Sequence, residues 1–296
     1  MIVAGRIHPK QVLQILHYVG RPLALLFCWD VLVTVAYMIT PYTFNSPPLP
    51  LSLIGSAIAV FLAFRNTTAY ARWWEARTLW GAMVNSSRSF ARELKMLLPP
   101  ECVAIRTELV RRHIAYVHAL RLHLRRQSPW SELEDRLPAS EREHLQTVTN
   151  VPNAILDRTA QIIGQLEGLD SIKLAAFAHT LSDFSDAQGG MERIKNTPFP
   201  RQYANYPIVF THGFCLLLPL GLVGSLGIYT PLGSTVAGFL FLALLQIGND
   251  MQAPFSNTEN DVPLTTLTRA IEIDLRESLG ETHHLKPVDL DNDVLW

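Results

Sequence analysis

The sequence predicts an all-α membrane protein with two apolar helical hairpins and a helical polar region. Three observations predict this fold. Only 17% of the 296 residues are charged, against about 25% in ordinary soluble domains. The charges avoid two long segments, residues 22–64 and 202–249, where Asp30 is the one charged residue. No segment alternates polar and apolar residues for long enough to require a sheet.

Each apolar segment is long enough to cross a bilayer twice. The segments contain 43 and 48 residues, and one crossing needs about 20. Turn-forming residues lie in the middle of each, at 41–50 and 229–233. We therefore expect four transmembrane helices near residues 22–42, 49–64, 205–228 and 233–249. The alternative, a pair of buried helices in a soluble α-protein, is disfavoured by 48 residues without one charge.

The basic residues predict the orientation. Both short connections between the spans lack charge, whereas Lys and Arg lie in the N-terminal arm, the middle region and the tail. Because cytoplasmic segments carry the excess of Lys and Arg, we expect a multi-pass protein of the plasma (inner) membrane with both termini in the cytoplasm. The predicted domains are 1–64 (arm and first hairpin), 65–201 (helical cytosolic domain), 202–249 (second hairpin) and 250–296 (acidic tail).

The middle region has the spacing of long helices. Residues 65–98 contain no proline and continue the second span, and 101–127 form another long helix with an apolar stripe. A shorter polar element over 131–150 follows. Further helices are expected over 152–168 and 170–187, the last ending at Gly189 and Gly190 because glycine commonly follows a helix.

Motifs for catalysis and cofactor binding are missing from the sequence, which contains no phosphate-binding loop, dinucleotide fingerprint, nucleophile elbow or HExxH zinc motif. We therefore expect no enzyme and no cofactor. A net charge of −1 argues against nucleic acid as a partner. His113, His118 and His123 recur every five residues and do not share one helix face, so we expect solvated or interface histidines instead of metal ligands.

A charged residue and a stripe of mostly apolar residues within the predicted spans each have two interpretations. Asp30 lies mid-span, where a carboxylate costs on the order of 3 kcal/mol. It is either an ion-pathway or proton-relay group, or a structural residue paired with Arg72, Arg65 or a backbone group. Ser56, Val60 and Phe64 recur every four residues on one helix face. They form either an ordinary packing stripe or a pore face closed by apolar rings.

Four motifs in order resemble the bestrophin family of ion channels, above all its bacterial members. The matching residues are Phe64-Arg65-Asn66 with Tyr70, Arg72, Glu75-Ala76-Arg77 and Trp80; Gly190 to Ile194 with Asn196-Thr197-Pro198; Pro254-Phe255 with Asn260 to Leu264; and Ala270 to Leu275. The resemblance covers nearly the whole chain. It implies a homopentamer in lipid, with four transmembrane helices per subunit around a central pore for small monovalent ions.

The resemblance also implies site residues. The family's apolar neck maps onto Ser56, Val60 and Phe64, and its lower aperture maps onto Ile172. Ser56 departs from the aliphatic residue that is usual there. The animal channels of the family have a calcium clasp rich in aspartates. The corresponding stretch of this sequence keeps only Glu259 and Asp261 as acids, so no metal site is expected.

The resemblance leaves the conducted ion and the mode of transport open. Cation (sodium) conduction is favoured, as in a bacterial type and in line with the acidic tail. The alternatives are an anion (chloride) channel, as in animal members, a proton-coupled secondary transporter using Asp30, or a non-conducting assembly.

Overall fold

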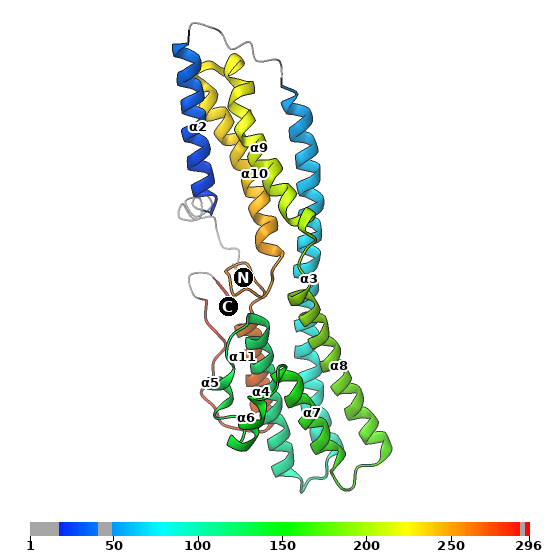
Figure 1. The fold of residues 1–296 in the computed structure, drawn as a ribbon. Coiled ribbons are helices and arrows are strands. Elements are labelled where there is room, and N and C mark those ends of the chain that lie inside the picture. Colours follow the sequence, from blue (N-terminus) through cyan, green and yellow to red (C-terminus); the bar gives the residue numbers. More distant parts are fainter. Residues whose placement is uncertain (1–17, 41–48, 291–293) are drawn as a thin grey trace. The chain divides into compact units, whose positions relative to one another are not determined.

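The computed structural model describes residues 18–40, 49–290 and 294–296 and is built from helices (Figure 1). Helix accounts for 78% of the structure, and the described residues contain no strand. The all-α class is therefore confirmed. The expected N-terminal arm up to residue 17 and most of the first inter-span connection, residues 41–48, lie outside the described residues.

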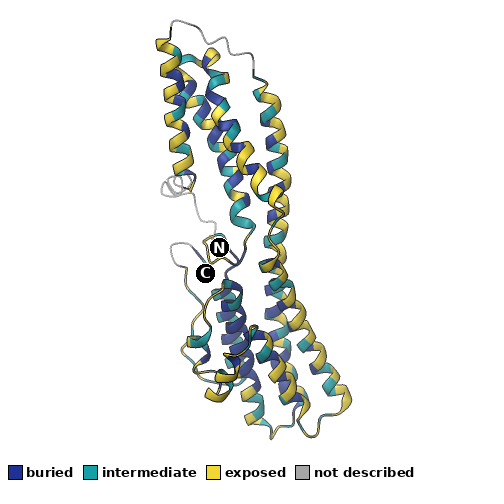
Figure 2. Cartoon of the chain, in the orientation of Figure 1, coloured by how far each residue is buried: buried dark blue, intermediate teal, exposed yellow. Residues whose placement is uncertain are grey.

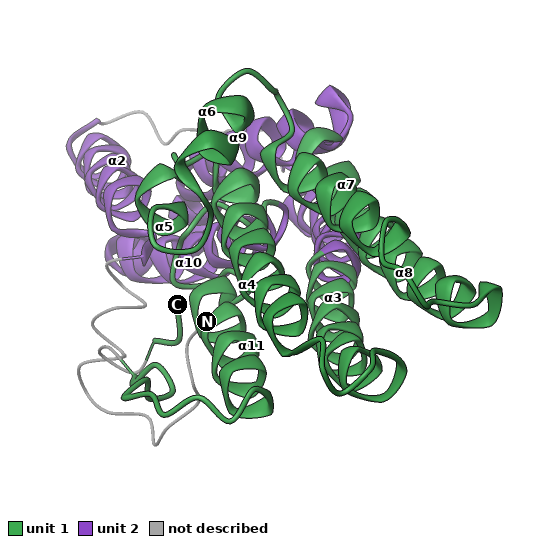
Figure 3. Cartoon of the chain, turned by 90° about the horizontal axis from the view of Figure 1, so that it is seen from below, with its two compact units in different colours: residues 1–3, 73–197, 253–296 green, residues 4–72, 198–252 purple. Residues whose placement is uncertain are grey.

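The chain divides into two compact units (Figure 3). Among the described residues, unit 1 comprises 73–197 and 253–296, and unit 2 comprises the residues up to 72 and 198–252. Helix α3 (Leu51–Leu97) contributes residues to both.

Unit 2 contains the apolar helices. They are α2 (Gly20–Ile39), the first part of α3, α9 (Arg201–Leu226) and α10 (Thr230–Met251), with the 3₁₀ turn η1 (Gly227–Tyr229) between the last two. Helix α10 packs beside both α9 and α2 (Figure 1). Gly227 makes the turn with a φ of +52°, a conformation that glycine adopts without a steric penalty.

Within the part of the chain that the structure describes, three helical segments are long and apolar enough to cross a membrane: Gly20–Ile39, Leu51–Leu97 and Arg201–Met251. The last has 51 residues and includes α9, η1 and α10. Two helices joined by a turn thus occupy the second apolar segment, where the sequence predicts a hairpin.

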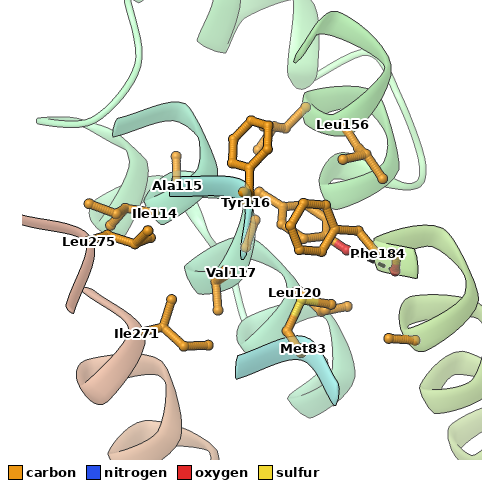
Figure 4. Close-up of a cluster of buried hydrophobic side chains, with 14 of the residues drawn as sticks. Met83, Ile114, Ala115, Tyr116, Val117, Leu120, Leu156, Phe184, Ile271 and Leu275 are labelled. Carbon is orange, nitrogen blue, oxygen red and sulfur yellow. Dashed lines mark hydrogen bonds between the residues drawn. The ribbon is translucent and has the colours of Figure 1, made fainter. Parts of the chain in front are cut away.

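Unit 1 holds the largest apolar core. Its helices are the remainder of α3, α4 (Val103–Arg125), α5 (Trp130–Leu133), α6 (Ala139–Leu145), α7 (Val151–Gly164), α8 (Ser171–Asn196) and α11 (Leu264–Ser278). Buried side chains from α3, α4, α8 and α11 meet around Tyr116, and Figure 4 shows Met83, Val117, Phe184 and Ile271 among them. Helix α4 is buried on most sides because it packs against α7, α8 and α11.

The helix predictions are largely confirmed, with two differences. The element predicted over 131–150 is two short helices, α5 and α6. The predicted end at Gly189-Gly190 is wrong, because α8 continues to Asn196. A Cβ at Gly190 would lie 2.9 Å from Leu79 Cδ1, so this glycine permits close packing against α3 and does not end the helix.

Candidate functional site

One face of α3 in unit 2 presents the predicted neck residues. Ser56 is exposed, Val60 is 55% exposed and Phe64 is 65% exposed. Exposed residues recur along this helix in Figure 2. These residues lie one helical turn apart, so their side chains share a face. The Ser56 hydroxyl donates to the Ser52 carbonyl oxygen at 2.7 Å, which leaves its lone pairs as acceptors. Within one chain this face is therefore a mostly apolar surface that the unit's own core does not cover.

The opposite face of α3 is anchored by apolar packing. Ile58 and Leu62 are buried with Phe214 and Leu218 of α9 and Leu245 of α10. Since residues at this spacing point away from the Val60 face, the packing fixes which side of α3 is exposed. An alanine methyl group at Gly55 would lie only 3.0 Å from the Phe214 ring.

Two arginines on this inner side of α3 reach the end of α10. Arg65 is completely buried; its guanidinium donates to the Leu245 carbonyl oxygen at 3.3 Å and to the Asn249 Oδ1 at 2.6 Å. Arg72 Nε donates to the Gln252 carbonyl oxygen at 2.8 Å. Cations are favoured at this position because the carbonyl end of a helix carries partial negative charge.

Asp30 is fully buried between α2 and α10. Its Oδ1 accepts from Ser234 Oγ at 2.8 Å, and its Oδ2 accepts from Thr235 Oγ1 at 2.9 Å. Arginine or backbone partners were the expectation, and the observed partners are hydroxyl groups instead. Both carboxylate oxygens are therefore satisfied by the neighbouring helix, and the arrangement links α2 to α10 within the apolar region.

Ile172 belongs to unit 1, at the start of α8. Its side chain is 81% exposed, and the helix start is capped by Asp170, whose carboxylate accepts from the Lys173 backbone N–H at 2.9 Å. A capped first turn fixes the direction in which an exposed side chain projects. The structure thus provides a large apolar residue on an ordered helix end.

The two acids of the reduced calcium clasp lie in a closed turn. Glu259 is exposed, whereas Asp261 is buried and accepts from Thr258 Oγ1 at 2.6 Å. The turn is closed by the Val262 N–H, which donates to the Pro254 carbonyl oxygen at 3.1 Å. No group of three or more His, Cys, Asp or Glu side chains suited to a metal occurs among the described residues.

Unit 1 also contains a buried ion cluster that sequence reasoning missed. The ring of His118 on α4 lies between two carboxylates: Nε2 is 2.9 Å from Glu272, and Nδ1 is 3.2 Å from Glu132. Arg136 and Arg276 lie 3.2 Å and 2.9 Å from Glu272. The cluster ties α4 and α11 to the segment after α5.

The cluster controls the pKa values of its acids. The hydrogen bond with His118 lowers the pKa of Glu132 to about 2, although partial burial opposes this. Burial alone would raise the pKa of Glu272, but its contacts with His118, Arg136 and Arg276 outweigh burial and lower it. Both groups are therefore carboxylates at neutral pH.

The expectation that the α4 histidines are solvated or lie at an interface is wrong for His113 and His118, because both are buried within unit 1. His113 is 2% exposed, 2.8 Å from Ser87 Oγ, and its ring centroid lies 4.4 Å from that of Phe184. Burial lowers its pKa to about 3, so it is neutral in the core. An i, i+5 spacing places residues on different faces, but α4 is covered on most of its faces, and periodicity alone does not reveal this.

Comparisons with known proteins identify relatives along nearly the whole chain. Residues 3–277 match the family described as bacterial/fungal bestrophin protein. The voltage-dependent anion channel-forming protein RSc3414 of Ralstonia nicotianae is 38% identical over 265 residues, covering 88% of this chain and 86% of the relative. The voltage-dependent anion channel-forming protein YneE of Escherichia coli K12 is 34% identical over 258 residues, covering 84% and 83%.

A solved structure of the same family has a similar fold. A bacterial bestrophin homologue from Klebsiella pneumoniae superposes with a TM-score of 0.83 at 30% sequence identity, covering 88% of this chain and 98% of that one. The names of the relatives favour the anion alternative over the cation conduction expected from the sequence. The family is one of channels, and this chain has helices long and apolar enough to cross a membrane, so it is a membrane protein. The chain belongs to the bacterial/fungal bestrophin family.

Proposed function

We propose that the chain is the subunit of a homopentameric anion channel that passes monovalent ions without energy coupling. The carrying observation is the exposed apolar face of α3, with Val60 and Phe64 more than half exposed although both lie in a helix anchored on its other side. Membership of a channel family supports the proposal, and the anion-channel names of the relatives support the sign of the ion.

The proposed pore has a neck and an aperture. Five copies of Ser56, Val60 and Phe64 would surround the neck, and five copies of Ile172 would surround the aperture. Apolar rings offer few groups that could replace an ion's hydration shell. Ions therefore pass largely hydrated when the ring is wide, and loss of water from the ring stops them when it narrows.

The proposed topology is the one expected from the charge distribution. Helices α2, α9 and α10 and the first part of α3 would cross the inner membrane, with both termini in the cytoplasm. Residues 65–201 and the tail from residue 250 would form the cytosolic part.

Cation conduction is the second candidate, and the acidic tail favours it. Residues 250–296 carry 3 basic and 10 acidic residues, which would attract cations to the cytosolic side. Proton-coupled transport through Asp30 has less support, because both of its carboxylate oxygens already accept hydroxyl hydrogen bonds from α10.

The sign of the conducted ion is tested by the reversal potential of the purified protein in planar bilayers under a potassium chloride gradient. We expect a potential close to that of chloride; a potential close to that of potassium would overturn the anion proposal and favour the cation candidate. Mass measurement of the purified assembly in detergent should give five subunits, and any other number would refute the pentamer.

The neck is tested by a double variant. Val60→Ala with Phe64→Ala widens the proposed ring and removes apolar surface, so single-channel conductance should rise by about twofold or more. The control is Leu25→Ala, which shortens an apolar side chain that is 73% exposed on α2; it should leave conductance unchanged. An unchanged current in the double variant would exclude these residues from the neck.

A further inference from the structure

Arg65 is a buried cation that no carboxylate neutralises. Its side chain has no exposed surface, and it makes no ion pair with any acid among the residues that the structure describes. Its partners are three neutral oxygens: the Leu245 carbonyl at 3.3 Å, Asn249 Oδ1 at 2.6 Å and Gln252 Oε1 at 3.4 Å. Arg65 Nε is buried and has no hydrogen-bond partner within the described part of the chain.

The position of Arg65 is built to hold this charge. Its oxygens come from the last turns of α10, where the helix dipole supplies roughly half a negative charge. An arginine remains protonated even when buried, so roughly half of its charge stays uncompensated. Gly248 leaves the room, because a Cβ there would lie 2.4 Å from an Arg65 terminal nitrogen and 2.2 Å from Asn66 Oδ1.

Arg65 also follows directly after the last proposed neck residue. Phe64 and Val60 occupy the exposed face of α3, and Arg65 lies on the buried side of the same turn. One helix diameter, about 10 Å, separates the two sides. A charge surrounded by protein is screened by salt much less than a surface charge, so its field reaches an ion passing the exposed face.

We propose that Arg65 is a selectivity-determining residue that favours anions through its field, without touching the ion. The proposal rests on the proposed function, since it takes the Val60–Phe64 face as the neck. Five such cations behind an apolar ring would lower the energy of an anion there and raise that of a cation. The neck itself carries no charged side chain, so the charges behind it set the sign.

The experiment measures the chloride-to-potassium permeability ratio in planar bilayers for the full-length protein and four variants. Arg65→Gln keeps a hydrogen-bonding side chain and removes the charge; we expect the ratio to fall by about threefold or more. Arg65→Lys keeps the charge and should keep most of the ratio. Arg158→Gln removes an exposed arginine of α7, whose bond is to Gln161 at 3.1 Å, and should leave the ratio unchanged.

A fourth variant keeps the proposal testable if Arg65→Gln fails to assemble. Asn249→Asp places a carboxylate on Arg65 at the position where the amide oxygen now lies 2.6 Å away. It neutralises the charge and keeps the guanidinium, so the ratio should fall as in Arg65→Gln. An unchanged ratio in either neutralising variant, in protein that assembles and conducts, would overturn the role of Arg65.

The permeability measurements test the role of Arg65 and the proposed anion function independently of each other. The role of Arg65 is read from the change in permeability ratio between variants, whose direction is the same whichever ion the unaltered channel prefers. The proposed anion function is read from the unaltered channel alone. A cation-selective channel that becomes more cation-selective in Arg65→Gln would refute the anion function and support the role of Arg65.

Discussion

Most buried charges are held in opposite ways in the two units; Asp261 of unit 1, held by the Thr258 hydroxyl, is the exception. In unit 1, the buried side chains of Arg112, Arg121 and Glu272 each lie in ion pairs, and His118 has two carboxylates beside it. In unit 2, buried Asp30 and Arg65 are satisfied by hydroxyl, amide and carbonyl groups.

The difference shows what each set of charges can do. Opposite charges in contact cancel each other's field at a distance, so the unit 1 cluster acts on stability and on the mutual placement of α4 and α11. A charge held by neutral dipoles keeps much of its field. The field of a charge such as Arg65 would act on an ion passing the proposed neck, and three changes test whether this division between the units holds.

The largest expected effect comes from breaking the paired cluster. Glu272→Gln removes a carboxylate that lies 2.9 Å from His118 and 2.9 Å from Arg276. Removing one partner of a buried pair leaves the other uncompensated, so the free energy of unfolding should fall by about 3 kcal/mol. Denaturant titration in detergent measures this.

The control for Glu272 lies on the same helix. Asp274→Asn breaks the pair between Asp274 and Arg88, 2.7 Å apart, whose side chains are 34% and 47% exposed. Exposed pairs contribute less than about 1 kcal/mol. Equal losses in the two variants would show that the cluster is no more stabilising than a surface pair.

A smaller effect is expected from pH, because His113 is neutral in the core. Its pKa is about 3 in the folded protein against 6.5 when exposed. Between these values the unfolded chain binds one more proton, so stability is complete above pH 6.5 and falls as pH decreases, by about 1.4 kcal/mol per unit. His113→Gln should flatten this dependence.

The measurement for His113 is best made between pH 6.5 and 4.5. Glu132, with a pKa of about 2 in the folded protein against an ordinary 4.5, contributes stability above pH 4.5 that is lost as pH falls toward 2. The higher interval thus excludes the titration of Glu132, and the difference in slope between His113→Gln and the unaltered protein isolates the histidine. The same pH slope in the variant and the unaltered protein would contradict a neutral buried His113.

The smallest effect is expected for Asp30→Asn. An asparagine keeps one acceptor for Ser234 or Thr235, and hydrogen bonds between apolar helices contribute about 0.6 kcal/mol on average. We expect a loss of stability below about 1 kcal/mol and an ion flux that does not depend on a proton gradient. Stopped-flow flux measurement with and without the gradient checks this, and loss of flux in Asp30→Asn would instead identify a relay group.

The sequence predicts the helices and the exposed stripe because both depend on local spacing. Two segments almost without charge identify the apolar helices, and a four-residue repeat places Val60 and Phe64 together. The partners of buried charges depend on contacts distant in sequence, as between Asp30 and Ser234. The periodicity of a sequence predicts which face of a helix a residue occupies, but it does not predict which other helix packs against that face.

The same limit explains the two misplaced expectations in unit 1. Glycine is typical of a helix end, but Gly190 lies within α8, where its lack of a side chain leaves space for Leu79 of another helix. His118 is expected from its spacing to be a solvated or interface residue, but it is buried beside Glu272, a residue of another helix. Neither neighbour could be identified from residues nearby in the chain.

The glycines of α10 limit how this helix can vary during evolution. A methyl group at Gly238 would lie 2.1 Å from Leu26 Cδ2 of α2, and one at Gly248 would collide with Arg65 and Asn66 of α3. Even alanine, the smallest possible replacement, would require the Leu26 side chain, or those of Arg65 and Asn66, to move away from α10. A substitution at Gly248 therefore acts first on Arg65 and Asn66, so the glycines of α10 hold the side chains of α2 and α3 in their present places.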